Sequence, residues 1–306
     1  MAFVPDLMTL PSEVMRVVMQ YLDMHSLCAL SQSSQRLRQQ VTEWPGKYWS
    51  TIRFAREGLE IWHGFSVLKS TYEAAPLYLT NAKIEMMEFE PDATLPDVPG
   101  LTANRLVIIG DVSGSRICQL LESVKPSALV LEQRLATFDH VESFVDRCNE
   151  QLRTLHLDEL CPQLISCTRS LHVPTIDVSH VSDALDFQQL CNFVRRILEE
   201  WQCGVRDIVD IYIRVDDMIF PEARMFGDAF ELVEDAEYCY RAVICRADGA
   251  TLQIGVSHSR ISLSEAICDN ATINRTSETV DSSYLDDLVS IVEDSLSDYE
   301  VYDDIY

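Results

Sequence analysis

Cys161 and two nearby histidines are the residues of this chain that most resemble a catalytic pair. A thiol beside His156 or His172 would be the arrangement of a nucleophilic cysteine. Closeness in sequence does not establish geometry, and an isolated cysteine is more often a core residue. The other histidines, which are His25, His63, His140, His180 and His258, do not have the spacing of metal ligands. Because no complete catalytic constellation is present, we expect neither an enzyme activity nor a cofactor.

A second candidate is the loop 110–115, Gly-Asp-Val-Ser-Gly-Ser, which follows an apolar run and precedes a helical pattern. Free N–H groups at the start of a helix attract anions, and phosphate-binding loops occupy this position. The loop lacks both the G-x-G-x-x-G pattern and a G-K-[ST] ending. A hydrolase or nucleotide-dependent enzyme is therefore the least supported class of function.

Composition excludes further classes. The chain has 306 residues, 47% of them hydrophobic, and should fold. A net charge of −25 repels nucleic-acid backbones and anionic lipid surfaces, so we expect neither partner. The sequence has no apolar run of about 18 residues for a membrane span, and we expect no secretory leader. The ten cysteines include no C-x-x-C pair, which favours reduced thiols and a cytoplasmic or nuclear location.

The N-terminal fifty residues predict three short helices. Pro11 suits a first helical turn, and apolar residues follow with helical spacing. Asp23 can cap the second helix, and Ser33 and Ser34 break the pattern before a third. So small a unit cannot bury all its apolar positions, which indicates a permanent protein partner. The alternative is a helical subdomain packed onto the rest of the chain.

These residues resemble an F-box over roughly residues 5–53. The matching positions are Leu10, Pro11, Glu13, Val14, Met15, Tyr21, Leu22, Asp23, Leu27, Leu30, Ser31, Ser34, Arg36, Leu37, Arg38, Val41 and Trp49. Ser33 departs from the pattern, because the family usually has an apolar residue there. The resemblance implies docking on a Skp-type linker protein, which carries the cullin scaffold. Carried over by position, the docking residues are Leu10, Pro11, Val14, Met15, Val18, Leu27 and Leu30.

The middle of the chain predicts an α/β fold. Residues 54–101 are punctuated by Pro76, Pro91, Pro96 and Pro99, and we interpret them as a connector with short strands or turns. Beyond it, predicted strands at 105–109, 128–131, 152–157 and 175–178 alternate with helices at 115–124, 141–148 and 164–170. The interval of about 23–24 residues lies within the range of leucine-rich-type repeats. Such a stack offers a long surface to a protein partner, and the alternative is an ordinary α/β core without a ligand face.

The second half predicts a helix at 187–202, a strand at 209–215 and a β-hairpin with strands at 238–245 and 251–256. Residues 165–260 resemble the F-box-associated (type 2-like) domain of a large nematode family. The match includes Leu190–Val194, Trp201, Gly204 and Val243–Thr251. It implies that residues 102–275 recognise a protein substrate, with no catalytic residues to transfer. Residues 276–306 are an acidic tail that we expect to be largely flexible.

The sequence therefore predicts the substrate-recognition adaptor of a cullin-type (SCF) ubiquitin ligase. The alternative is an F-box scaffold or inhibitor that sequesters a partner outside the ligase. One compositional feature bears on the first prediction: the only lysines are Lys47, Lys69, Lys83 and Lys125. A recognition region without lysine would reduce modification of the receptor by its own ligase, although sequence drift explains the same pattern.

Overall fold

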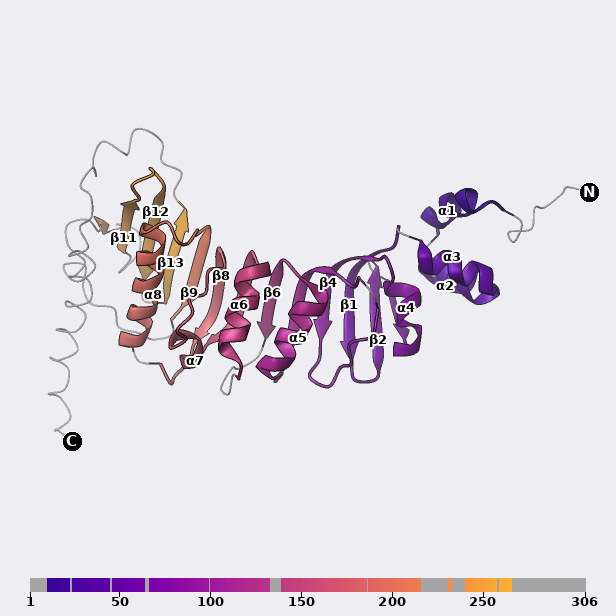
Figure 1. Ribbon diagram of the computed structural model, residues 1–306, viewed down its shortest axis with the longest axis horizontal. Helices are drawn as coiled ribbons and strands as arrows, with labels where there is room; N and C mark the ends of the chain where they lie inside the picture. The colour runs from indigo at the N-terminus through magenta and orange to yellow at the C-terminus, as the bar shows by residue number, and fades with distance from the viewer. Residues whose placement is uncertain are drawn as a thin grey trace, which may run out of the picture. The chain divides into compact units, whose positions relative to one another are not determined.

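The computed structural model describes residues 10–22, 24–44, 46–63, 66–98, 100–132, 139–185, 187–215, 231–232, 240–257 and 259–265. The chain divides into two compact units, Met1–Gln133 and Arg134–Tyr306, which we treat separately (Figure 1). Within these ranges no helix is both long and apolar enough to cross a membrane. The predicted acidic tail at 276–306 lies outside the described residues.

Unit 1 begins with the three predicted helices, α1 (Ser12–Gln20), α2 (Met24–Ser33) and α3 (Gln35–Glu43). Pro11 precedes α1, and its carbonyl accepts the first helical hydrogen bond from the Met15 N–H at 3.0 Å. Ser34 caps α3, because its hydroxyl accepts from the Leu37 N–H at 3.2 Å. The proposed cap of α2, Asp23, lies outside the described residues.

A six-stranded region of sheet follows in unit 1, in the order β6–β5–β4–β1–β2–β3. The strands are β1 (Tyr48–Ala55), β2 (Gly58–His63), β3 (Ser66–Ser70), β4 (Lys83–Phe89), β5 (Ala103–Ile109) and β6 (Ala128–Glu132). The β1–β2–β3 meander is antiparallel, whereas β1, β4, β5 and β6 pair in parallel. Helix α5 (Gly114–Val124) joins β5 to β6 and buries Ile117, Leu120, Leu121 and Val124.

The segment 54–101, which we predicted to be a connector with short strands or turns, contains β2, β3 and β4, and all three are strands of the sheet. Pro76, Pro91 and Pro96 lie outside these strands. Pro76 lies in the first turn of the short helix α4 (Ala75–Leu79), which follows the 3-10 helix η2 (Tyr72–Ala74), and Pro91 follows β4. The core continues through this region: Phe54 of β1 stacks on Phe89 of β4 with ring centroids 4.3 Å apart.

Unit 2 contains the strands β7 (Thr154–Leu160), β8 (Thr175–Val181), β9 (Asp210–Arg214), β10 (Glu231–Leu232), β11 (Tyr240–Cys245), β12 (Thr251–Ser257) and β13 (Arg260–Glu265). Their order is β10–β11–β12–β13–β9–β8–β7. Strands β7, β8 and β9 are parallel, and the remaining pairs are antiparallel. The helices are α6 (Val141–Gln151), α7 (Pro162–Ile165) and α8 (Phe187–Gln202).

The predicted hairpin is present as β11 and β12, with Gly249 at a φ of 88° in the turn. The predicted helix at 164–170 is a shorter helix that starts earlier, since Pro162 opens α7. Strand β13 was not predicted, and it pairs between β12 and β9 (Figure 1). The α/β class holds, and a leucine-rich-repeat-like or F-box-associated fold stays a prediction.

Candidate partner-binding surfaces

Helix α1 presents an apolar stripe to solvent. Val14, Val17 and Tyr21 have exposed fractions of 44%, 52% and 84%, and they follow the i, i+3, i+7 spacing of one helical face. Met15 and Met19 lie on the opposite face and are buried, each with 1% exposed. The structure therefore separates the apolar residues of α1 into a packed face and an open one.

The predicted docking residues differ in exposure in the same way. Pro11 and Val14 are exposed, and Leu10, Val18 and Leu30 are half-buried. Met15 and Leu27 are buried among residues of their own chain, so we assign them to the core of the helical subdomain. Docking through the remaining five stays a prediction. Val17 was missed, although its spacing from Val14 and Tyr21 was visible in the sequence.

Helices α2 and α3 are fastened to the sheet through α4. The Cys28 thiol donates to the Tyr78 hydroxyl at 3.5 Å, and the Trp49 indole N–H donates to the Tyr78 carbonyl at 2.8 Å. Burial, reinforced by the thiol, raises the pKa of Tyr78 to about 12. The alternative of packing onto the chain thus holds for α2 and α3, while the outer face of α1 stays open.

Lys47 forms a further contact between α3 and α4. Its side chain is buried, and its ammonium donates to the Thr42 carbonyl at 2.6 Å and the Leu77 carbonyl at 3.1 Å. Thr42 lies in the last turn of α3, where carbonyls lack helical partners and attract cations. Burial lowers the pKa of Lys47 to about 8. The junction between α3 and α4 therefore depends on a cation inside the protein.

Unit 2 has a polar sheet face. Along β7, β8 and β9 the apolar residues Leu155, Leu157, Ile176, Val178, Ile211 and Ile213 are buried. The alternating residues point to the other side and none is buried: Thr154, His156, Asp158, Thr175, Asp177, Ser179, Asp210, Tyr212 and Arg214. Helices α6 and α8 lie together on one side of these strands (Figure 1). We call the set of alternating residues the polar face.

A hydrogen-bonded chain crosses the polar face. His156 Nδ1 lies 2.8 Å from a carboxylate oxygen of Asp177, and His156 Nε2 lies 3.3 Å from the hydroxyl of Ser179. The order of groups is that of a serine hydrolase, in which N–H donors must also be aimed at an oxyanion. Strand β8 is paired along both edges, where its N–H groups serve the ladders. The contacts of His156 with Asp177 and Ser179 join β7 to β8 across this face.

The structure does not form the Cys161–His156 or Cys161–His172 pair that the sequence suggested. Cys161 is fully buried, and burial raises the pKa of its thiol. His156 pairs with Asp177, and His172 lies 3.5 Å from a carboxylate oxygen of Glu200. Cys161 is therefore a core residue, whereas each histidine has a carboxylate beside it. No group of three potential metal ligands occurs among the described residues.

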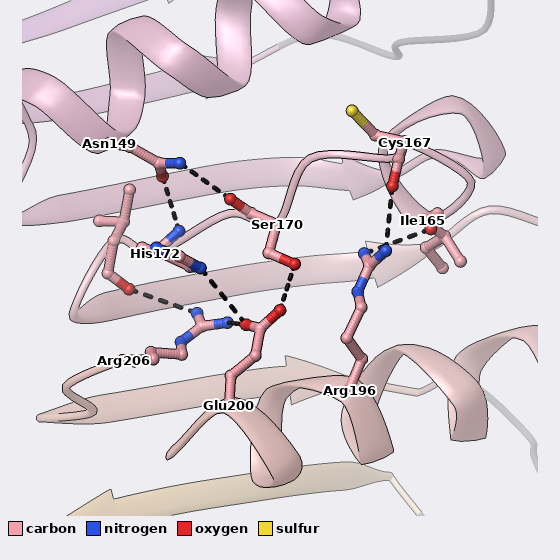
Figure 2. Close-up of polar contacts among 9 residues, drawn as sticks. Asn149, Ile165, Cys167, Ser170, His172, Arg196, Glu200 and Arg206 are labelled. Atoms are coloured by element: carbon pink, nitrogen blue, oxygen red, sulfur yellow. Dashed lines mark hydrogen bonds and ion pairs between the residues drawn. The ribbon is translucent and has the colours of Figure 1, made fainter. Parts of the chain in front are cut away.

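A polar cluster ties the loop before β8 to two helices (Figure 2). Asn149 of α6 donates to the Ser170 carbonyl at 2.8 Å and accepts from the His172 N–H at 2.6 Å. Arg196 of α8 donates to the carbonyls of Cys167 at 2.9 Å and Ile165 at 3.3 Å. The loop therefore satisfies its backbone groups through side chains of α6 and α8.

Glu200 occupies the centre of this cluster. Its carboxylate accepts from the Ser170 hydroxyl and lies 3.7 Å from the guanidinium of Arg206, whose side chain is 1% exposed. Arg206 also donates to the Val173 carbonyl at 3.5 Å. Burial lowers the pKa of Arg206 to about 10, and Glu200 opposes that shift. The cluster fixes the entry to β8, the strand that carries Asp177 and Ser179.

Comparison with protein-family models matches the F-box domain to residues 7–47. An F-box domain forms the N-terminus of unit 1. It contains α1, α2 and α3 and ends before β1, so the predicted boundary at residue 53 extended six residues into the sheet. No curated protein and no solved structure matches the chain. The nematode type and the F-box-associated domain at 165–260 stay predictions.

The F-box match bears on what the exposed apolar stripe of α1 binds. F-box domains bind Skp-type linkers within cullin complexes, and this supports a general role as a substrate adaptor in SCF-type ubiquitin ligases. The adaptor assignment rests on these 41 matched residues and the exposed stripe they contain. What the remainder of the chain binds is a separate question.

Proposed function

We propose that this chain docks on a Skp-type linker through the F-box and presents a protein substrate on the polar face of unit 2. The observation that carries the first half is the stripe of Val14, Val17 and Tyr21, which is exposed in the isolated chain. Covering apolar surface contributes roughly 25 cal/mol per Å², so such a stripe favours a lasting partner. Leu10, Pro11, Val18 and Leu30 are proposed to extend this interface.

The construction of unit 1 supports this assignment. Cys28 and Lys47 join α2 and α3 to α4, and Trp49 joins α4 to β1 of the sheet. These contacts leave the outer face of α1 for a partner. An adaptor must hold its substrate at a defined place relative to the linker, and these contacts limit movement of the F-box on its sheet. The buried free thiols of Cys28, Cys161 and Cys167 fit a reducing compartment, and we propose a cytoplasmic or nuclear location.

The polar face supports the second half of the proposal. It combines carboxylates, hydroxyls, an imidazole and an arginine on paired strands, which hold the side chains at fixed spacings. Hydrogen-bonding groups on a rigid support confer specificity on a protein interface. We infer no enzyme activity for the chain, since the groups that pair on this face lack an evident oxyanion site.

Reconstitution tests the two halves separately. Purified chain is mixed with a Skp-type linker and a cullin, and the complexes are separated by size-exclusion chromatography. A complex of all three proteins supports the adaptor function, and failure to bind the linker contradicts it. A complex with linker that excludes the cullin favours the alternative, in which the chain sequesters a partner outside the ligase.

Photocrosslinking tests the polar face. A photoreactive phenylalanine replaces Tyr212 on this face, with Asn192 on the outer side of α8 as the matched control position. Adducts are compared in cell extract and tested as ubiquitination substrates of the assembled ligase. The proposal expects a substrate adduct at position 212 and none at 192. Adducts that form equally at both positions would remove the polar face as the substrate site.

A further inference from the structure

Lysine is distributed very unevenly between the two units. All four lysines, Lys47, Lys69, Lys83 and Lys125, fall in unit 1, and the 181 residues after Lys125 contain none. Arginine continues through the same stretch as far as Arg275, so the chain does not avoid positive charge there. What unit 2 lacks is a primary amine on a side chain. Ubiquitin is attached to such amines, and a guanidinium does not replace them.

The structure divides the four lysines further. Lys47 is 2% exposed and its ammonium is held between two carbonyl oxygens, so it cannot reach a reagent in solution. Lys69 lies on the edge strand β3 with 80% of its side chain exposed, although it forms an ion pair with Glu60 at 2.8 Å. Lys83 begins β4 and is exposed. Lys125 is exposed just after α5, with a left-handed φ of 51° that turns the chain away from the helix.

We propose that ubiquitin transfer to the chain itself is confined to Lys69, Lys83 and Lys125, and that unit 2 is spared because it offers no acceptor amine. This proposal rests on the proposed function, since it requires the chain to sit in an active ligase. In the transfer step, the lysine nitrogen attacks the carbonyl carbon of a ubiquitin thioester. A C–N isopeptide bond forms, the C–S bond breaks, and the departing thiolate takes the proton that the amine loses.

The arrangement has a consequence for an adaptor. A surface that presents a substrate brings that substrate and its own side chains equally close to the ubiquitin thioester. If the presenting unit carried lysines, they would compete with the substrate as acceptors. Because unit 2 has none, its own side chains do not compete with the amines of the bound protein. Turnover of the chain by its own ligase is then controlled through unit 1.

The test uses the full chain in a reconstituted ligase with linker, cullin, RING protein, charged conjugating enzyme and ubiquitin, without substrate. Modified sites are mapped by tandem mass spectrometry for the wild type and the K69R/K83R/K125R variant, which keeps every charge and retains Lys47. We expect modification of the wild type at the three exposed lysines and its loss in the variant. Modification of the variant at Lys47 or at the terminal amine would overturn the confinement.

A third chain tests why unit 2 is spared. Arg214, an exposed residue of the polar face, is changed to lysine in the triple variant. Modification at position 214 supports protection by absence of lysine, and an unmodified R214K chain overturns it. Linker and cullin binding are measured in parallel by size-exclusion chromatography. If no complex forms, the proposed function fails and this inference with it, whereas an assembled and active ligase that leaves the wild type unmodified refutes this inference alone.

Discussion

Glu200 and Arg206 form an ion pair inside unit 2, with 3.7 Å between a carboxylate oxygen and a guanidinium nitrogen and with the arginine side chain 1% exposed. Ser170 and His172 complete the surroundings of the carboxylate. A buried ion that loses its counter-charge retains the full cost of its burial. The pair therefore holds α8 and the loop before β8 in place together.

Replacement of Glu200 by glutamine should destabilise the protein by about 3 kcal/mol, because it leaves Arg206 buried without a counter-charge. Glu199 is the matched control: it is the preceding residue, 53% exposed, and pairs with Arg195 at 3.2 Å on the surface of α8. Glu199→Gln should cost less than about 0.5 kcal/mol. Urea titration measures both, and equal losses would contradict the structural role of the pair.

The buried Lys47 predicts a distinctive pH dependence of stability. Its pKa falls from 10.5 to about 8 on folding, so between these values the unfolded chain binds more protons than the folded chain. The stability of the wild type should therefore increase relative to Lys47→Met as pH rises from 8 towards 10.5, by up to about 3 kcal/mol. Below pH 8 the difference between the two proteins should be constant.

Urea titrations at intervals from pH 7 to pH 10 give this difference directly, because other titrating groups are common to both proteins. Parallel stability profiles for the wild type and Lys47→Met would show that Lys47 is not buried as a cation. The reverse slope, with the wild type losing ground as pH rises, would mean that the hydrogen bonds to Thr42 and Leu77 outweigh desolvation.

Val14 and Met15 are adjacent in sequence, but their replacement by alanine should have very different effects on stability. Met15 is 1% exposed, so Met15→Ala should cost about 2–5 kcal/mol through loss of burial and the cavity that remains. Val14 is 44% exposed, and Val14→Ala should change stability by less than about 0.5 kcal/mol. Thermal and urea unfolding of the two variants would detect a reversed assignment of the packed and open faces.

Gly58 tests the close packing of β2 on β3, and Gly249 is the control. Gly58 has a φ of 153°, and a Cβ there would lie 2.3 Å from the Ser70 carbonyl oxygen of β3. Gly249, in the β11–β12 turn, has a φ of 88° and open space around the Cβ position. Gly249→Ala should cost about 1 kcal/mol from backbone strain alone, and Gly58→Ala clearly more. Similar unfolding midpoints would argue against the close packing of β2 on β3.

The elements that the sequence predicted well are those with a strong local pattern. Helix α8 repeats apolar residues at 3.6 spacing from Leu190 to Trp201, and Asp248-Gly249 marks the β11–β12 turn. The β1–β2–β3 meander was missed because Trp49 and Ile52 seemed to continue the helical subdomain. Pro76, Pro91 and Pro96 then concealed β4, although all three lie outside a strand.

The sites were harder to predict, because they depend on contacts between distant residues. His156 meets Asp177 and Ser179 through the parallel register of β7 and β8, which pairs His156 with Asp177. The sequence places His156 nearer to Cys161, and that closeness favoured the wrong partner. Val17 could have been found from its spacing on α1, whereas the burial of Met15 and Leu27 depends on packing within the helical subdomain.

The central claim is that the exposed stripe of α1 binds a Skp-type linker, and an affinity measurement tests it most directly. Isothermal titration of purified linker into the wild type, Val17→Asp and the control Arg16→Gln gives three dissociation constants. Arg16 is exposed and lies away from the stripe, and its replacement by glutamine lowers the net charge by one, as Val17→Asp does. Val17→Asp should weaken binding by about tenfold or more, since it places a charge in an apolar interface, while Arg16→Gln should bind as the wild type does. Equal affinity for the wild type and a folded Val17→Asp chain would contradict the claim.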